Sequence, residues 1–371
     1  MSDLAGSPSR AAVRAEAKRL RAVFEAAGGE VVETTILQPA EVLLDLYGED
    51  IRARAYVTSD PLKGEQMLRP DFTVPVVQMH MDSGAEPARY TYSGEVFRRQ
   101  EDDPRRASEY FQVGYEVMGA AAPAEADAEV FALMQDILAP LGLTPATGDI
   151  GILMAAIDGL GTTDARKAAL RRHVWRPRRF RALIDRFSGR APVPASRAAL
   201  LGAADPMAEA GPLIGLRSAS EIAARIDALR ADAVAAPIAE GEVDLLSAML
   251  AVRETCPNAL EQLRDIAVDM PALRGAVAAL AARLDAMDAR GVDVAALPFE
   301  TSYGRAQMEY YDGFVFGFTS DAHPDLPPIA TGGRYDALTR RLGAGREIPA
   351  VGGVIRPGLV ARLTAEAGGA A

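Results

Sequence analysis

Polar residues in the segment 110–118 could line a binding site. A period of two places Gln112, Gly114 and Glu116 on one face of a strand and apolar residues on the other. An amide, a glycine and a carboxylate suit the floor of an open antiparallel sheet, because glycine lets a ligand approach the backbone closely. The alternative is a solvated strand face, which the pattern alone favours, since half-buried strands are common.

An arginine ends a second segment of the same kind, residues 89–98. Arg98 is in phase with Tyr92 and Gly94 on one face of the predicted strand. A guanidinium at that position could hold a carboxylate or a phosphate in bidentate fashion. The alternative is a surface arginine paired with an acidic residue in 101–103.

Other motifs are less specific. Asp71 and Thr73 lie at a turn before a predicted helix, where the default role of Thr73 is an N-cap. The pair Gly332-Gly333 before a helix predicts either a tight turn or an anion-binding nest, and Gly352-Gly353 is weaker evidence still. The chain has neither a P-loop motif nor a Gly-x-Ser-x-Gly motif, so nucleotidases and hydrolases that use them are disfavoured.

The composition indicates a folded protein whose net charge does not attract polyanions. The 371 residues include 40 Lys and Arg against 51 Asp and Glu, a net charge of −11, which disfavours nucleic acid and anionic membranes as partners. One cysteine excludes an intramolecular disulfide and multi-cysteine zinc motifs, and three scattered histidines predict no metal site. Without an apolar run of about 20 residues, no membrane span or signal peptide is expected. We therefore expect a cytoplasmic protein.

The elements that must position these residues fall into two strand-rich blocks around a helical middle. Residues 10–27 predict a helix that stops at Gly28-Gly29, followed by a strand over 31–37 and a short helix over 40–47. Alanine- and leucine-rich segments fill 155–290, and strand-like texture returns after Pro298. The pattern predicts an α+β core domain, 1–150 and 295–371, with a helical insertion over 155–290.

Five motifs in order resemble the catalytic core of histidyl-tRNA synthetases: Met67–Thr73, Tyr92–Arg98, Glu109–Gly119, Tyr310–Phe316 and Gly332–Leu338. The resemblance covers roughly residues 10–150 and 295–365, with the helical middle as an insertion. It implies a class II aminoacyl-tRNA synthetase-like fold, an antiparallel sheet flanked by helices.

Departures from the synthetase pattern fall on residues that hold ATP or lie near the activated carboxylate. Gln100 takes the place of a glutamate, and Leu359 stands where the third motif has an arginine, with Arg356 displaced. The histidine-specific Arg-Gly-Leu-Asp-Tyr-Tyr reads Ala-Gln-Met-Glu-Tyr-Tyr over 306–311, which loses an arginine unless Arg305 replaces it. Because adenylate formation depends on stabilising phosphoryl charge, we expect adenylate chemistry to be impaired.

This impaired form, which stops about ten residues after the third motif, is similar to the family of ATP phosphoribosyltransferase regulatory subunits. These synthetase paralogues partner a short-form catalytic subunit in the first step of histidine biosynthesis. The resemblance implies a non-catalytic subunit in a hetero-oligomer, with histidine as a candidate feedback effector. It implies no tRNA binding, no anticodon-binding domain and no cofactor. A dimer is expected through the segment 10–37, where the class makes its dimer interface.

Two alternatives remain open at this point. One is a histidine-activating ligase or aminoacyltransferase that acts on an acceptor other than tRNA. The other is a histidine-binding module with an unrelated partner.

The resemblance also implies a histidine pocket, with residues matched one by one. Asp71, Thr73 and Gln112 match positions that hold the α-amino group, although Asp71 is one methylene shorter than the usual glutamate. Arg98 matches the contact to the α-carboxylate.

At the other end of the ligand, Glu116 and Tyr311 match the contacts to the imidazole, and Tyr335 matches a tyrosine that lines the pocket. A zwitterion with a second ionisable ring needs separate anionic and cationic partners in one desolvated site, which this set would provide.

Overall fold

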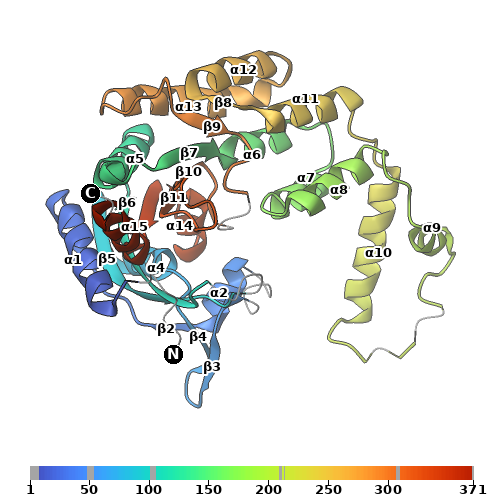
Figure 1. The fold of residues 1–371 in the computed structure, drawn as a ribbon. Helices are drawn as coiled ribbons and strands as arrows, with labels where there is room; N and C mark the ends of the chain where they lie inside the picture. The colour runs from blue at the N-terminus through green and yellow to red at the C-terminus, as the bar shows by residue number, and fades with distance from the viewer. Residues whose placement is uncertain are drawn as a thin grey trace.

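The computed structural model describes residues 8–47, 54–100, 106–208, 211–212, 214–305 and 310–369. A nine-stranded sheet with an antiparallel middle forms its centre (Figure 1). In spatial order its strands are β1 (Glu30–Val31), β5 (Ala88–Phe97), β6 (Glu109–Met118), β12 (Ala350–Ile355), β11 (Ala330–Arg334), β10 (Phe314–Thr319), β7 (Thr144–Asp149), β9 (Pro298–Glu300) and β8 (Arg253–Thr255). A smaller sheet has the order β2 (Leu37–Pro39), β4 (Gly64–Leu68) and β3 (Val57–Asp60).

Helices precede and follow these strands along the chain. Those from the two strand-rich blocks are α1 (Arg10–Ala26), α2 (Ala40–Tyr47), α4 (Thr73–Ser83), α5 (Pro123–Leu138), α14 (Asp336–Leu342) and α15 (Pro357–Gly369). Those from the middle of the chain are α6 (Ile150–Gly159), α7 (Asp164–Arg172), α8 (Pro177–Phe187), α9 (Ala195–Gly202), α10 (Ala219–Val234), α11 (Glu240–Ala251), α12 (Cys256–Asp269) and α13 (Arg274–Asp288). Short 3₁₀ turns occupy Ala139–Leu141 and Pro271–Leu273.

Helix α1 forms where the sequence predicts it. The Ser9 side chain caps its start by accepting a hydrogen bond from the Ala12 amide, and Leu20 and Phe24 are buried one turn apart. Gly28 follows the helix with φ of +93°, a conformation that favours glycine. The continuous strand predicted over 31–37 is wrong, because β1 ends at Val31 and the next strand starts at Leu37.

Both faces of β6 are covered, so the solvated-face alternative is wrong. On one face Tyr115 is fully buried, and its hydroxyl donates to Glu129 of α5 and to the backbone carbonyl of Ala27 after α1. On the other face Gln112 and Glu116 are each 1% exposed. The predicted alternation is therefore correct, but the polar face lies inside the molecule.

The middle of the chain contributes to the sheet as well as extending from it. Strand β8 pairs with β9 at one edge of the large sheet, and α13 packs against α5. Helices α9 and α10 extend away from the sheet, and Figure 1 shows α10 standing apart from the strand-rich blocks. The division into a core and an insertion over 155–290 stays a prediction.

A buried ion network connects α13 to the sheet. The Arg283 guanidinium donates to Asp127 of α5 and to Asp149 at the end of β7, each at 2.8 Å. Asp127 also accepts from Arg334 of β11 at 2.7 Å. These charges balance one another in a low-dielectric environment, which makes each partner costly to remove.

Within the ranges that the structure describes, no helix combines the length and apolar character needed to cross a membrane.

Candidate functional site

The carboxylate of Glu116 lies at the centre of a cluster of hydroxyl groups. Its Oε1 accepts hydrogen bonds from Thr73 Oγ1 at 3.1 Å and from the Tyr92 hydroxyl at 2.7 Å. Its Oε2 accepts from the Tyr335 hydroxyl at 2.5 Å. An ionised carboxylate has about four acceptor positions, so these three donors leave one position for a ligand N–H.

Burial controls the ionisation of this carboxylate. Desolvation raises the pKa of Glu116 to about 7, even though the hydrogen bonds from Tyr335, Tyr92 and Thr73 favour the charged form. The nearby charge of Asp71 contributes to the same rise in pKa. Glu116 therefore titrates near neutral pH, in the range where a free imidazole also titrates.

We expect Glu116 to make the stability of the protein depend on pH. Its folded-state pKa of about 7 lies above its ordinary value of 4.5, so the stabilisation is complete below about pH 4.5 and is lost as the pH rises to about 7. Between these two pH values the free energy of unfolding of the wild type should fall by about 3 kcal/mol relative to that of Glu116→Gln. This figure follows from about 1.4 kcal/mol for each pKa unit. Chemical denaturation at a series of pH values measures this difference. Parallel curves for the two proteins would contradict it.

Strand pairing places a glycine against the carboxylate. Gly352 of β12 is the register partner of Glu116, and a Cβ atom at this position would overlap Glu116 Oε2. Strand β5 pairs with the other edge of β6, and there the Tyr92 ring covers Gly114. Sequence reasoning missed Tyr92 and Gly352 as site residues. The only available signal was that Tyr92 is in phase with Gly94, on the face that carries Arg98.

The substitution Gly352→Ala is expected to displace the Glu116 carboxylate. Its methyl group would occupy the position of Oε2, which would break the hydrogen bond from Tyr335. Overpacking of this kind costs about 1–3 kcal/mol of stability. Thermal unfolding measures that cost. Gly353→Ala is not a neutral control, because Met134 lies close to that position, so Gly241→Ala, with open space around it, is the comparison. Equal stability of Gly352→Ala and Gly241→Ala would contradict the close contact between Gly352 and the Glu116 carboxylate.

Tyrosine rings from the segment before β10 complete the cluster. Tyr311 is 4% exposed, and its ring centroid lies 6.5 Å from that of Tyr335. Burial raises the pKa of Tyr311, and the charge of Glu116 raises it further. Four of the seven predicted residues thus meet: Thr73, Glu116, Tyr311 and Tyr335.

Asp71, and not Thr73, accepts a backbone hydrogen bond at the start of α4. Thr73 is the first residue of α4, and its hydroxyl donates to Glu116, so the N-cap expectation for Thr73 is wrong. Asp71 accepts instead from the Val74 amide at 3.3 Å, at the start of the same helix. It is 2% exposed and lies close enough to Glu116 to affect its pKa.

Gln112 and Arg98 lie further along the two strands. Gln112 faces Gly94 across the β5–β6 pair, and its Oε1 is buried with no hydrogen-bond partner within the described part of the chain. A buried acceptor without a donor is costly, which makes it ready for a ligand N–H. Arg98 is half-buried, and its Nε donates to the Pro70 carbonyl at 2.7 Å. Its alternative partners in 101–103 lie outside the described residues.

The cations nearest to the altered synthetase motifs are engaged elsewhere. Arg305 Nε donates to the Val174 carbonyl at 2.9 Å, and its guanidinium lies 4.9 Å from the Phe180 ring centroid, against the helical middle of the chain. Arg356 donates to the Pro328 carbonyl. Residues 306–309 lie outside the described ranges.

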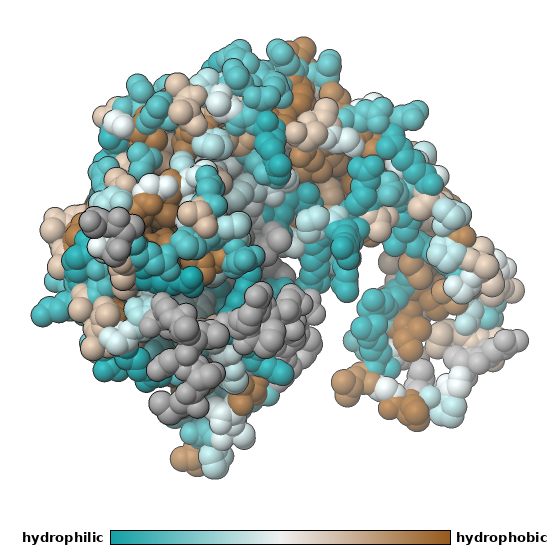
Figure 2. Space-filling view, viewed as in Figure 1, coloured by the Kyte–Doolittle hydropathy of each residue, from teal (hydrophilic) through white to brown (hydrophobic). Residues whose placement is uncertain are grey.

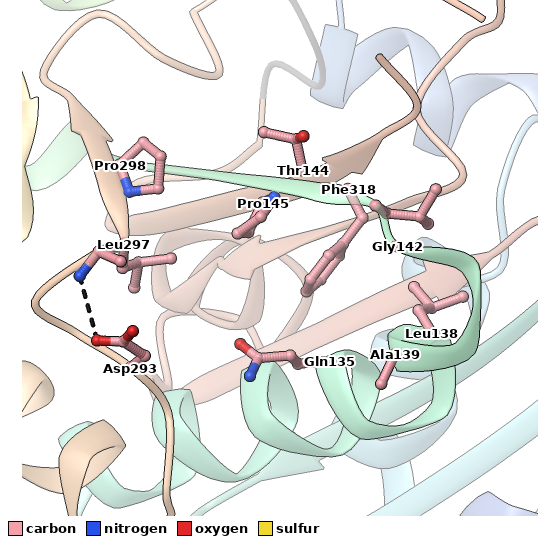
Figure 3. Close-up of a pocket in the computed structure, with 12 residues that line it drawn as sticks. Gln135, Leu138, Ala139, Gly142, Thr144, Pro145, Asp293, Leu297, Pro298 and Phe318 are labelled. Atoms are coloured by element: carbon pink, nitrogen blue, oxygen red, sulfur yellow. Dashed lines mark hydrogen bonds between the residues drawn. The ribbon is translucent and has the colours of Figure 1, made fainter. Parts of the chain in front are cut away.

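A separate cavity of about 390 Å³ lies where α5 ends and β7 begins (Figure 3). Its lining is mostly apolar and includes Leu138, Pro145 and Phe318, with Gln135 and Asp293 at its side. None of the seven predicted site residues lines this cavity. The described residues hold no group of three or more His, Cys, Asp or Glu side chains placed to bind a metal ion.

The sheet and the Glu116 cluster define a class II synthetase-like protein. A family model described as histidyl-tRNA synthetase matches residues 5–231 and 208–357. A solved structure from Bacillus halodurans, described as an ATP phosphoribosyltransferase regulatory subunit/histidyl-tRNA synthetase, superposes with a TM-score of 0.67 at 20% identity and covers 98% of this chain and 81% of its own. Histidyl-tRNA synthetase from Nostoc superposes with a TM-score of 0.63 at 17% identity, covering 99% and 76%. These two similarities establish the fold.

Sequence relatives narrow the class. The proteins named ATP phosphoribosyltransferase regulatory subunit from Brucella canis and Brucella ovis are each 33% identical over 353 residues, which is 90% of this chain and 93% of theirs. The chain belongs to the family of ATP phosphoribosyltransferase regulatory subunits, paralogues of the histidyl-tRNA synthetases. The predicted resemblance and fold class are confirmed.

Proposed function

We propose that this chain is the non-catalytic regulatory subunit of an ATP phosphoribosyltransferase and acts in the cytoplasm in the first step of histidine biosynthesis. Its partner is a separate short-form catalytic subunit. The observation that carries this proposal is the 33% identity, over nearly the whole chain, to relatives with that name. The positions of Arg305 and Arg356 support the absence of catalysis, because both are bound to backbone carbonyls.

The proposal includes free histidine as the ligand of the Glu116 pocket. The remaining acceptor position of Glu116 suits an imidazole N–H, and the partnerless Oε1 of Gln112 suits the α-amino group. Arg98 supplies a cation for the α-carboxylate. For histidine to regulate the complex, it must bind one assembly state more tightly than another, since equal affinities shift no equilibrium.

Self-association through residues 10–37 also belongs to this proposal. Strand β1 is an edge of the large sheet and β2 is an edge of the smaller one, and Val31, Ile36 and Leu37 remain 41–46% exposed. Apolar residues at an unpaired edge are typical of surfaces that another chain covers. Val31→Lys together with Leu37→Lys should shift the chain to a smaller species in sedimentation experiments, and an unchanged sedimentation coefficient would contradict this interface.

Reconstitution tests the functional proposal directly. The tagged chain, purified gently from its own host, should co-elute with a short phosphoribosyltransferase. Product formation from ATP and phosphoribosyl pyrophosphate should require both chains, and histidine should inhibit it. If the chain alone catalyses histidine-dependent ATP–pyrophosphate exchange and no such partner co-elutes, the proposal fails in favour of a ligase. Histidine binding without either activity would indicate a binding module with another partner.

A further inference from the structure

Helices α7 and α8 carry a concentration of positive charge in an acidic protein. Residues 164–187 contain nine Lys and Arg against two Asp, a net charge of +7, whereas the whole chain has −11. Figure 2 shows hydrophilic side chains over this segment. Charge of this density indicates an anionic partner.

Four of these cations form no ion pair in the described part of the chain: Lys167, which donates to the Asp158 carbonyl, and three arginines. Arg171 and Arg181 pair with Asp158 and Asp185, and two further arginines of the segment pair with Asp232. In contrast, Arg172, Arg178 and Arg179 are exposed and make no ion pair with any described residue. Arg172 is the last residue of α7, and Arg178 and Arg179 lie in the first turn of α8.

The first turn of α8 is an unfavourable place for arginines. The helix starts at Pro177, has no side-chain cap and has no acidic residue in its first turn. Its amide groups give the N-terminus a partial positive charge, so Arg178 and Arg179 there destabilise the helix. A bound anion would reverse this cost, since helix N-termini bind oxyanions through their free amides.

A buried guanidinium with one nitrogen that lacks a partner contacts the same turn. Arg305 is 6% exposed, and its Nε donates to Val174 while its charged group lies over the ring of Phe180, in the first turn of α8. Its Nη2 has no acceptor, and neither does Trp175 Nε1 at the turn, within the described residues. Burial lowers the pKa of Arg305 to about 10. A buried cation without an anion is costly, so the site is electrostatically incomplete.

We propose that the α7–α8 turn binds a small phosphate-bearing anion, such as phosphate or pyrophosphate, through Arg178 and Arg179, with Arg305 adding charge from behind. Several guanidiniums and a helix N-terminus suit a multiply charged tetrahedral oxyanion better than a single carboxylate. This site is separate from the Glu116 pocket and does not depend on the proposed histidine ligand.

Titration calorimetry of the full chain with sodium pyrophosphate, in a phosphate-free buffer, tests this site. The double variant Arg178→Ala/Arg179→Ala should lose about ten-fold or more in affinity, because two charge-assisted hydrogen-bonding groups are removed. The matched control is Arg181→Ala, on the same helix but already paired with Asp185, which should change affinity by less than about two-fold.

Thermal unfolding separates binding from folding. Without ligand, the double variant should be at least as stable as the wild type, because it removes like charge from a helix N-terminus. Wild-type affinity in the double variant, an equal loss in Arg181→Ala, or no saturable binding of phosphate or pyrophosphate would overturn the proposal. Displacement of pyrophosphate by a short RNA at equal phosphate concentration would also overturn the proposal, because it would identify a nucleic acid as the ligand of this site.

Discussion

Replacement of Glu116 by alanine is expected to weaken histidine binding by roughly 100-fold, because truncation of a buried charged partner costs about 2–5 kcal/mol. The variant removes the proposed imidazole acceptor and leaves the hydroxyls of Thr73, Tyr92 and Tyr335 without their common partner. Titration calorimetry with histidine measures the affinity. In the reconstituted complex, inhibition by histidine should weaken in parallel.

The matched control for this experiment is Glu129→Ala. Glu129 also accepts from a tyrosine hydroxyl, that of Tyr115, but it lies on the opposite face of the sheet and pairs with Arg89. The variant Glu129→Ala should therefore bind histidine with unchanged affinity. Glu116→Gln keeps the side-chain shape and separates loss of charge from loss of packing. Retained histidine binding and unchanged inhibition in Glu116→Ala would remove this residue from the mechanism.

The second large effect concerns stability. Arg283→Met should lower the free energy of unfolding by about 3–5 kcal/mol, because it leaves buried carboxylates without their cation. Asp149 loses its arginine partner, and Asp127 retains Arg334 alone. Urea denaturation measures the change.

Arg253→Met provides the exposed comparison. Arg253 pairs with Glu300, but its side chain is 75% exposed, so its loss should destabilise the protein far less than the loss of Arg283. Adding Asp149→Asn to Arg283→Met should recover part of the stability, because it removes one of the uncompensated charges. Equal effects of Arg283→Met and Arg253→Met would show that the buried network contributes no more than a surface ion pair.

Local pattern was sufficient for helix α1 and for the alternation along β6, but not for the strand predicted over 31–37. The spacing of Leu20 and Phe24 and the glycines after α1 determine that helix, and the alternation around Glu116 determines which side chains of β6 share a face. The resemblance selected Thr73, Glu116, Tyr311 and Tyr335, which do meet in space. These features depend on residues that are close in sequence or on motif order.

Contacts between distant segments were decided by the tertiary structure. Gly352 faces Glu116 because β12 pairs with β6, and the Tyr92 ring covers Gly114 because β5 and β6 adopt one particular register. Thr73 donates to Glu116 and does not cap its helix, because the packing of α4 on the sheet brings the two together. Arg305 contacts Val174 rather than the pocket for the same reason. Strand register and helix packing are properties of the whole core, so periodicity within a segment does not specify them.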